Sequence, residues 1–147
     1  MFLFRSLKIA TAALVAGSTL MAMPALAQGN RINIEQWGHA NSIGGGQSGR
    51  GQRLTVIQDG TGNLSINTQD GRRNRAAVGQ TGRNNAVDTH QCGSNNRVGV
   101  SQVGRNNSAD VGQCGNRNVA AVVQVGRGSS ASVSQNGSNN VVAIVQE

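Results

Sequence analysis

Residues 95–113 read NNRVGVSQVGRNNSADVGQ and contain the same pattern twice. Asn96, Val98, Val100 and Gln102 alternate with other residues, and the pattern begins again at Asn107. The unit is N-x-[A/V]-x-V-x-Q-x-G-x-x, which is eleven residues long. A fixed period of this kind decides the fold before any other feature. Its glutamine recurs eleven times without insertion or deletion, as Gln36, Gln47, Gln58, Gln69, Gln80, Gln91, Gln102, Gln113, Gln124, Gln135 and Gln146.

Each unit predicts one strand followed by a turn. The alternation has the period of two of a β-strand, so we predict seven-residue strands from Asn30–Gln36 through Asn140–Gln146. The glycine after each glutamine predicts a tight turn, because glycine readily takes a positive φ. If every turn reverses the chain, two units form one coil of 22 residues. Each strand then lies parallel to the strand one coil away, at a distance of about 4.8 Å.

Three columns of outward residues share this 22-residue spacing. They favour a coil of two strands, because such a coil stacks each unit on the unit 22 residues away. Antiparallel hairpins would not explain why units 22 residues apart resemble each other more than adjacent units do. The sequence therefore predicts an all-β fold, a parallel β-solenoid of about 5.5 two-strand coils. The columns are Arg31, Arg53, Arg75 and Arg97 at the strand starts, Arg83, Arg105 and Arg127 in a turn, and Cys92 with Cys114.

The repeats are looser over residues 30–69 and clean from about residue 74. Gly44–Gly46 replace an apolar inward residue, and Gln52 replaces the asparagine of its unit. In the unit 63–69, Leu64 and Ile66 take outward slots. A one-residue slip would turn such a strand over, so we expect local irregularity there.

The first 27 residues are predicted to be a secretory signal peptide. Arg5 and Lys8 precede a small-residue apolar stretch, and Ala25–Ala27 has the form of an A-x-A cleavage site. The apolar stretch is too short and too interrupted for a good membrane span. The expected mature chain, residues 28–147, is one solenoid domain.

The mature chain is basic and almost free of aromatic residues. It has eleven arginines, no lysine and six acidic residues, a net charge of +5, and Trp37 is its one aromatic residue. A basic surface suggests anionic partners such as lipopolysaccharide, phospholipid headgroups, polysaccharide or extracellular DNA. A simple solubility charge explains the balance equally well.

Inward columns of valine and alanine predict a thin core, flanked by columns of amides. Stacked glutamine and asparagine side chains can pair along the stack, as in cross-β structures. At the two end coils the pairing fails, so the ends favour another copy of the chain. The asparagines expected to join the glutamines in these assembly ladders are Asn74, Asn85, Asn96, Asn107, Asn118 and Asn140.

Cys92 and Cys114 are expected about 5 Å apart, which is within disulfide range. An exported chain meets oxidising compartments, so a disulfide and two free thiols are both open readings. A metal site with His90 would have only three ligands and no spacing signature, and we predict no metal and no cofactor.

The arginine column at 31, 53, 75 and 97, with the turn arginines 83, 105 and 127, is the candidate anion-binding surface. Like charges stacked near 5 Å repel by up to about 1 kcal/mol when exposed, and a phosphate- or sulfate-bearing polymer would offset this. The other reading is that repelling side faces restrict growth to the stack axis.

The motif Q-x-G-x-x-N-x-A-x-V-x-Q, at Gln69–Gln80 and again at Gln102–Gln113, resembles the curlin repeat. The resemblance covers nearly all of the mature chain. It departs from the family in using asparagine where alternate strands usually begin with serine, in lacking tyrosine, and in having two cysteines. In that family the Gln and Asn/Ser ladders carry assembly.

The resemblance implies a non-enzymatic subunit of curli, the functional amyloid fibres of bacterial surfaces and biofilms, either the major subunit or the minor, nucleating one. It implies secretion as an unfolded chain through a dedicated outer-membrane channel, polymerisation at the cell surface, and a partner curlin subunit. The sequence shows no catalytic arrangement and no sign of sequence-specific nucleic-acid binding. The alternative is a monomeric β-solenoid that binds anionic polysaccharide, DNA or ice, although ice-binding faces use Thr-x-Thr columns that this chain lacks.

Overall fold

The computed structural model describes residues 29–147, which form eleven strands. The predicted signal peptide lies outside the described residues. No helix in the described part of the chain is long and apolar enough to cross a membrane. The strands are β1 (Arg31–His39), β2 (Ser42–Arg50), β3 (Arg53–Thr61), β4 (Leu64–Arg72), β5 (Arg75–Arg83), β6 (Ala86–Ser94), β7 (Arg97–Arg105), β8 (Ser108–Asn116), β9 (Val119–Arg127), β10 (Ser130–Ser138) and β11 (Val141–Gln146).

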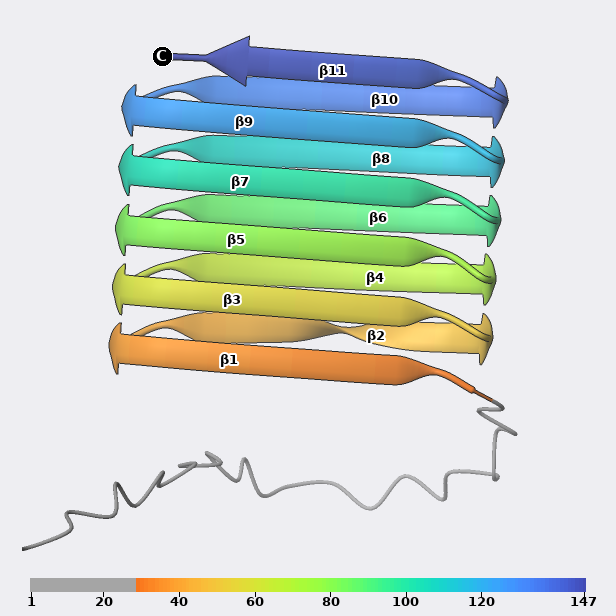
Figure 1. Ribbon diagram of the computed structural model, residues 1–147, viewed down its shortest axis with the longest axis horizontal. Coiled ribbons are helices and arrows are strands. Elements are labelled where there is room, and N and C mark those ends of the chain that lie inside the picture. The colour runs from red at the N-terminus through yellow and green to blue at the C-terminus, as the bar shows by residue number, and fades with distance from the viewer. Residues whose placement is uncertain (1–28) are drawn as a thin grey trace, which may run out of the picture.

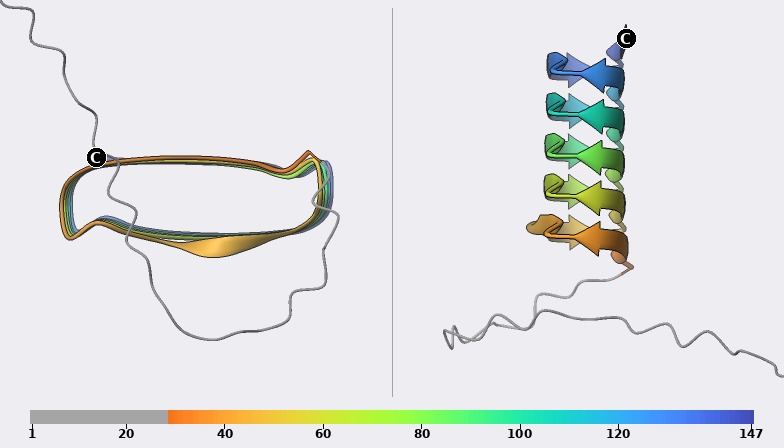
Figure 2. Two further views of the ribbon diagram at one scale, coloured as in Figure 1. Left: turned by 90° about the horizontal axis from the view of Figure 1, so that it is seen from below. Right: turned by 90° about the vertical axis from the view of Figure 1, so that its left-hand side faces the viewer.

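The strands wind into a flat solenoid with two parallel sheets (Figure 1). One sheet has the order β1-β3-β5-β7-β9-β11, and the other has the order β10-β8-β6-β4-β2. Paired residues are 22 positions apart throughout, as in Gln80 with Gln102. Seen end on, the coils superimpose as one flattened ring (Figure 2). The predicted solenoid with 22 residues per coil is therefore confirmed.

The strands are longer than predicted, because the glycine after each glutamine does not end the strand. Gly82 and Gly104 pair within β5 and β7, and the ladder continues to Arg83 and Arg105. At Gly82 the φ angle is +120°, and an added Cβ would lie 1.9 Å from the carbonyl oxygen of Gly104. The glycine thus kinks the strand where two backbones approach closely, and the connection to the next strand is made by the two residues after Arg83, Asn84 and Asn85.

The core is thin and lies between the two sheets, both of which contribute inward side chains. In the clean repeats it consists of valine and alanine, whose small volumes fit two sheets in close contact. These side chains are at most 6% exposed. The core cluster is Leu54, Val56, Ala76, Val78, Val87, Val98, Val100, Ala109, Val111, Ala120, Val122, Ala131 and Val133.

The expected irregularity at the 63–69 unit is absent. Strand β4 keeps the register of its neighbours, with Ser65 and Asn67 buried. Asn67 Nδ2 donates to Ser65 Oγ at 2.8 Å, and Thr89 Oγ1 donates to Asn67 Oδ1 at 2.7 Å. This internal polar cluster satisfies the inward groups, so the strand has no reason to turn over. The irregular strand is instead β2, which bulges outward from the ring (Figure 2) and contains Gly45 with a φ angle of +140°.

Candidate assembly interface

Two continuous columns of glutamine side chains run along the inside of the solenoid. In the six-stranded sheet, Nε2 of each glutamine from Gln36 to Gln124 donates to Oε1 of the glutamine one coil later, at 2.7–3.0 Å. The column from Gln47 to Gln135 does the same at 2.6–3.1 Å. All these bonds point the same way along the stack. The ladders are therefore polar, with acceptors open at one end and donors at the other.

The glutamines also hold the two sheets together. The second N–H of Gln102 donates to the Ala86 carbonyl oxygen of the facing sheet at 3.0 Å, and Gln58 bonds Ser42 in the same way at 3.2 Å. Between the ends, Gln113 donates to the ladder alone. The others use both amide hydrogens and the oxygen, namely Gln58, Gln69, Gln80, Gln91, Gln102 and Gln124. Full pairing explains how such large polar side chains stay buried.

The asparagine columns link successive coils through the backbone, not side chain to side chain as the sequence predicted. Asn96 Nδ2 donates to the carbonyl oxygens of Cys92 and Gly115, at 2.8 and 3.1 Å. Its Oδ1 accepts the backbone N–H of Asn118 at 3.0 Å. The side chain is too short to reach its copy while turning into the corner, so it fastens the corner of its own coil to the next one. Five of the predicted asparagines (Asn74, Asn85, Asn96, Asn107, Asn118) share this arrangement; Asn140 donates to Asn136.

Gln52 interrupts this column of corner bonds. Its Nε2 donates to the carbonyl oxygens of Ser48 and Gly71, as an asparagine would. Its Oε1, however, is buried and has no hydrogen-bond partner within residues 29–147. In other coils, the asparagine Oδ1 accepts the backbone N–H of the residue 22 positions later. The extra methylene of Gln52 moves its oxygen away from the corresponding N–H, that of Asn74. The sequence marked Gln52 as a variant but gave no sign of this unpaired acceptor.

One end of the solenoid also leaves a ladder acceptor unpaired. Gln47 Oε1, in β2, is buried and without a hydrogen-bond partner among the described residues. At the other end, Gln135 and Gln146 each donate one bond to a backbone carbonyl and have no later glutamine to receive the second. An unpaired buried acceptor costs about 1–3 kcal/mol. The two ends are therefore complementary in hydrogen bonding.

Cys92 and Cys114 are joined by a disulfide, with their Cα atoms 4.6 Å apart. They are register partners within β6 and β8. The seven-residue strands predicted from the sequence end one residue earlier, at Gln91 and Gln113, and would have left both cysteines in turns. His90 lies close enough to form a three-residue cluster with them. Because both sulfurs are in the bridge, neither offers a thiolate to a metal ion.

A second stacked pair in the same two strands consists of carboxylates. Asp88 and Asp110 are register partners on the outer face. Partial desolvation and the charge of Asp110 raise the pKa of Asp88 above 3.8, and the nearby His90 opposes the shift. The sequence placed these residues 22 positions apart, but nothing in it distinguished them from other exposed acids.

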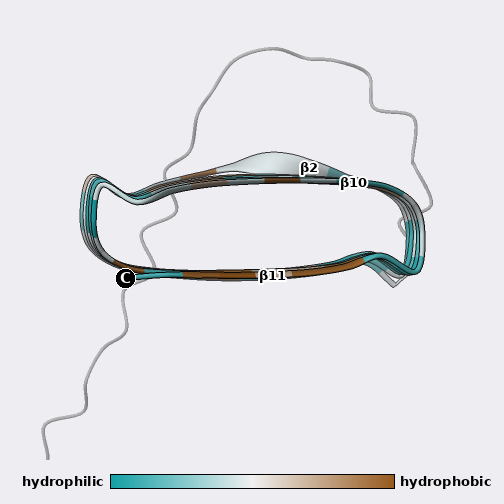
Figure 3. Ribbon diagram, turned by 90° about the horizontal axis from the view of Figure 1, so that it is seen from above, coloured by the Kyte–Doolittle hydropathy of each residue, from teal (hydrophilic) through white to brown (hydrophobic). Residues whose placement is uncertain are grey.

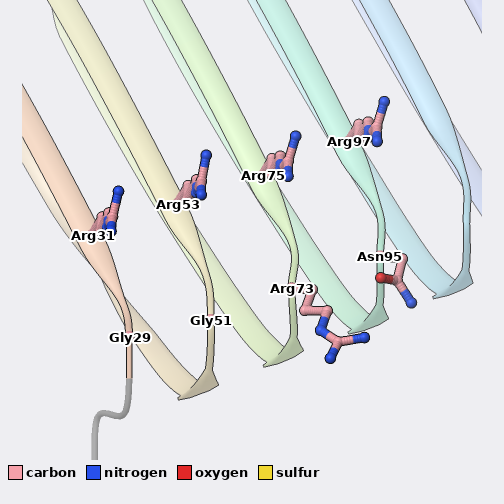
Figure 4. Close-up of a pocket in the computed structure, with 8 residues that line it drawn as sticks. All are labelled: Gly29, Arg31, Gly51, Arg53, Arg73, Arg75, Asn95 and Arg97. Atoms are coloured by element: carbon pink, nitrogen blue, oxygen red, sulfur yellow. The ribbon is translucent and has the colours of Figure 1, made fainter.

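The arginines stand at the two edges of the flat solenoid. Arg31, Arg53, Arg75 and Arg97 stack as register partners, with parallel side chains (Figure 4). With Arg73 they form what we call the arginine edge. The second column stacks at the opposite edge, since Arg83, Arg105 and Arg127 end their strands. A groove of about 310 Å³ runs along the arginine edge, lined by Gly29, Arg31, Gly51, Arg53, Arg73, Arg75, Asn95 and Arg97.

The outer face of the six-stranded sheet changes from basic to apolar towards β11. Arg97 is followed in its column by Val119 and Val141. Val141 and Val145 are 73% and 69% exposed, and β11 is the hydrophobic strand at this end (Figure 3). This end therefore offers both a free backbone edge and exposed apolar side chains.

Comparison with known proteins identifies the repeat itself. The model of the Curlin associated repeat matches residues 68–88, 82–115 and 104–137. These matches cover β5 to β9, where glutamine ladders, corner asparagines and kink glycines are all regular. No curated protein matches the chain. Its three repeat matches and its two-strand coils of 22 residues show that the chain belongs to the Curlin associated repeat family.

Proposed function

We propose that this protein is a secreted structural subunit of extracellular, curli-type amyloid fibres that serve cell adhesion and the biofilm matrix. The repeat is a structural one and not an enzymatic one. Copies join end to end, so that the glutamine ladders and backbone edges of one copy continue into the next. The observation that carries the proposal is the buried, unpaired Oε1 of Gln47 at one end, which matches the free amide donors at the other end.

The disulfide fits the same location, because disulfides persist in oxidising environments outside the cytoplasm. A dedicated outer-membrane channel and a partner curlin subunit belong to this proposal through the family. Whether the chain acts as the major or the nucleating subunit is tested by deleting its gene. Loss of all fibres indicates the major subunit, and fibres that form but detach from cells indicate the nucleator.

Fibre diffraction of the purified mature chain tests assembly. We expect a meridional reflection near 4.7–4.8 Å together with amyloid dye binding. The backbone N–H groups of Arg97 and Val119 point towards the following coil, so strand alternation directs the N–H of Ala143 towards the free edge of β11. Ala143→Pro should therefore leave the coil intact and prevent growth at that end.

The matched control is Ala143→Val, which keeps the N–H group and suits a strand. It should form fibres as the unmodified chain does. A chain that remains soluble for days without the meridional reflection would overturn the proposal. Fibres of Ala143→Pro that grow at the normal rate from both ends would show that β11 is not a growing end.

The arginine edge supports a second function, the binding of an extended anionic polysaccharide. Stacked arginines recur at the strand spacing of about 4.8 Å, which is comparable to the length of one sugar ring. A polyuronate carries one carboxylate on each ring, so successive carboxylates can meet successive guanidinium groups. A single-stranded nucleic acid would lack a stacking platform, because the mature chain has only Trp37 as an aromatic residue.

The floor of the groove is low because Gly29 and Gly51 occupy corner positions where later coils have Arg73 and Asn95. Gly51 has a φ angle of +68° and Asn95 one of +60°. Asparagine tolerates this conformation, so Gly51→Asn should fill the groove without disturbing the corner. We expect this change to weaken binding of alginate, used as the polyuronate probe.

Replacing Arg31, Arg53, Arg75 and Arg97 with glutamine should abolish alginate binding at moderate salt, since it removes the whole column. The matched control replaces the opposite column, Arg83, Arg105 and Arg127, and should retain most of the binding. Unchanged binding in the first variant would exclude the arginine edge. Binding of duplex DNA without binding of alginate would favour a nucleic-acid partner instead.

A further inference from the structure

The two sheets of the described chain contain different numbers of strands. Residues 31–146 supply six strands to one sheet and five to the other. The coil rises by one strand spacing for every two strands, so consecutive strands differ in height by half a spacing (Figure 1). The strand highest in the stack, β11, and the strand lowest in it, β1, therefore belong to the same sheet.

This inequality constrains how a second copy can stack. If the next copy has the same orientation, its β1 follows β11 at one strand spacing. Its β2 then lies two spacings, about 10 Å, beyond β10. The five-stranded sheet would be interrupted by a gap the width of one strand. The backbone edges of β10 and of the next copy's β2 would then lack hydrogen-bond partners inside the fibre, and each buried unpaired group would cost free energy.

A half-turn about the stack axis removes the gap. The rotation exchanges the two sheets and reverses the strand directions, and the strands of the two sheets already run in opposite directions (Figure 1). Strand β1 of the next copy then pairs in parallel with β10, and its β2 pairs with β11. Both junctions have the spacing found within the chain.

We propose that successive copies in the fibre are related by a half-turn, so that the six-stranded sheet of each copy continues as the five-stranded sheet of the next. This proposal rests on the proposed end-to-end assembly. The fibre then has two continuous sheets with eleven strands contributed by every copy, and the arginine edge alternates between its two sides.

The side chains at the junction favour this arrangement. With the glutamines in register, Gln146 meets Gln47 of the next copy and can donate to its buried, unpaired Oε1. In the unrotated stack no side chain of the preceding copy lies one spacing from Gln47, and this acceptor stays unpaired. The polarity is also correct, because donors point from each glutamine towards the following coil.

The apolar residues fit in the same register. Ile32 and Ile34 of β1 are 57% and 46% exposed, and they would cover Ala131 and Val133 at the free edge of β10. Ile144 of β11 would face Gly45 of the next copy, where β2 has no side chain in the inward slot. The missing volume at Gly45 is thus compensated by the bulkier residue beneath it.

Cysteine cross-linking distinguishes the two orientations. Cys92 and Cys114 occupy the outward slot after the glutamine in neighbouring strands, and they are bridged. Trp37, Ser48 and Asn136 occupy the same slot in β1, β2 and β10, and Glu147 directly follows Gln146 at the end of β11. A half-turn places Ser48 beside Glu147, whereas the unrotated stack places Trp37 beside Glu147. The two informative variants therefore share Glu147→Cys. One combines it with Ser48→Cys, and the other combines it with Trp37→Cys.

We expect oxidised fibres of the Ser48/Glu147 variant to give a ladder of covalent oligomers on non-reducing gels, and those of the Trp37/Glu147 variant to remain monomeric. The reverse result overturns the half-turn, as does the absence of cross-links in both variants when microscopy shows fibres. Trp37→Cys with Asn136→Cys tests the other half-turn junction if the first variant does not assemble. Absence of fibres from the unmodified chain contradicts the proposed function itself.

Discussion

Gln52 shows how closely the corner geometry depends on one methylene group. Its Oε1 is buried and unpaired, whereas Oδ1 of Asn74 in the next coil accepts the backbone N–H of Asn96. Gln52→Asn should restore this bond to Asn74. We expect the free energy of unfolding to rise by about 1 kcal/mol, seen as a higher guanidinium midpoint for dissolution of the assembled protein.

The reverse change one coil later is the natural control. Asn74→Gln should displace the acceptor from Asn96 and lower the midpoint, by about 1–3 kcal/mol in free energy. A lower midpoint for Gln52→Asn would mean that filling the space with the longer side chain outweighs the lost hydrogen bond.

The kink glycines permit a contact that no other residue can make. Gly82→Ala would place a Cβ 1.9 Å from the Gly104 carbonyl oxygen, at a φ angle of +120°. We expect a loss of about 4 kcal/mol or more, among the largest effects of single substitutions. Gly79→Ala, where an added Cβ meets nothing within 4 Å, should change the midpoint by less than about 1 kcal/mol. Equal effects of the two changes would show that the close approach is unimportant.

At the scale of the strand, β6 and β8 combine a covalent link with an electrostatic conflict. The disulfide closes a loop across 22 residues, and loops of this length restrict the unfolded chain by about 3 kcal/mol. Reduction should lower the guanidinium midpoint accordingly. A variant with Cys92→Ser and Cys114→Ser should have the lower midpoint already and be insensitive to reductant. A midpoint that does not respond to reduction would contradict the predicted stabilisation.

The carboxylate pair in the same strands gives a pH dependence with a defined sign. Because the folded-state pKa of Asp88 is raised, the fold binds its proton more tightly than the unfolded chain does. This contribution to stability is present below pH 3.8 and is lost as the pH rises through the raised pKa. Asp110→Ser, which copies Ser132 of the next coil, should reduce the stability lost as the pH rises through the pKa of Asp88. Guanidinium midpoints of the unmodified chain and of this variant, measured as the pH is raised from below 3.8, test this prediction. Identical curves would exclude the coupling between the two carboxylates.

Sequence reasoning was most successful at the element scale and least successful for individual amides. The eleven-residue period fixed which residues face inward, because side-chain alternation and coil length leave no other register. It could not show that glycine continues the strand, since a positive φ fits a turn equally well. Nor could it decide whether Asn96 would pair with its copy or with the backbone, because an amide serves both purposes. The polar cluster of Ser65, Asn67 and Thr89 likewise depends on three side chains meeting across coils.

At the scale of the whole molecule, charge should control how fast copies join. Residues 28–147 have eleven arginines against six acidic residues, and these arginines lie at strand ends and corners, so that approaching copies repel one another. Raising the ionic strength from 0.01 to 0.15 M shortens the screening length from about 30 to about 8 Å. We therefore expect fibre elongation from preformed seeds to accelerate over this range, as followed by dye fluorescence.

The variant with glutamine at positions 31, 53, 75 and 97 has a net charge of +1 in place of +5, because four of the eleven arginines are removed. Its elongation should be faster at low salt and depend less on salt, since less repulsion remains to be screened. Slower elongation of this variant at low salt would mean that the arginines assist docking, for example by meeting the carboxylate of Glu35 or Glu147 on the next copy. Unchanged salt dependence would place the controlling charges elsewhere, and the opposite column of Arg83, Arg105 and Arg127 would then be the next to replace.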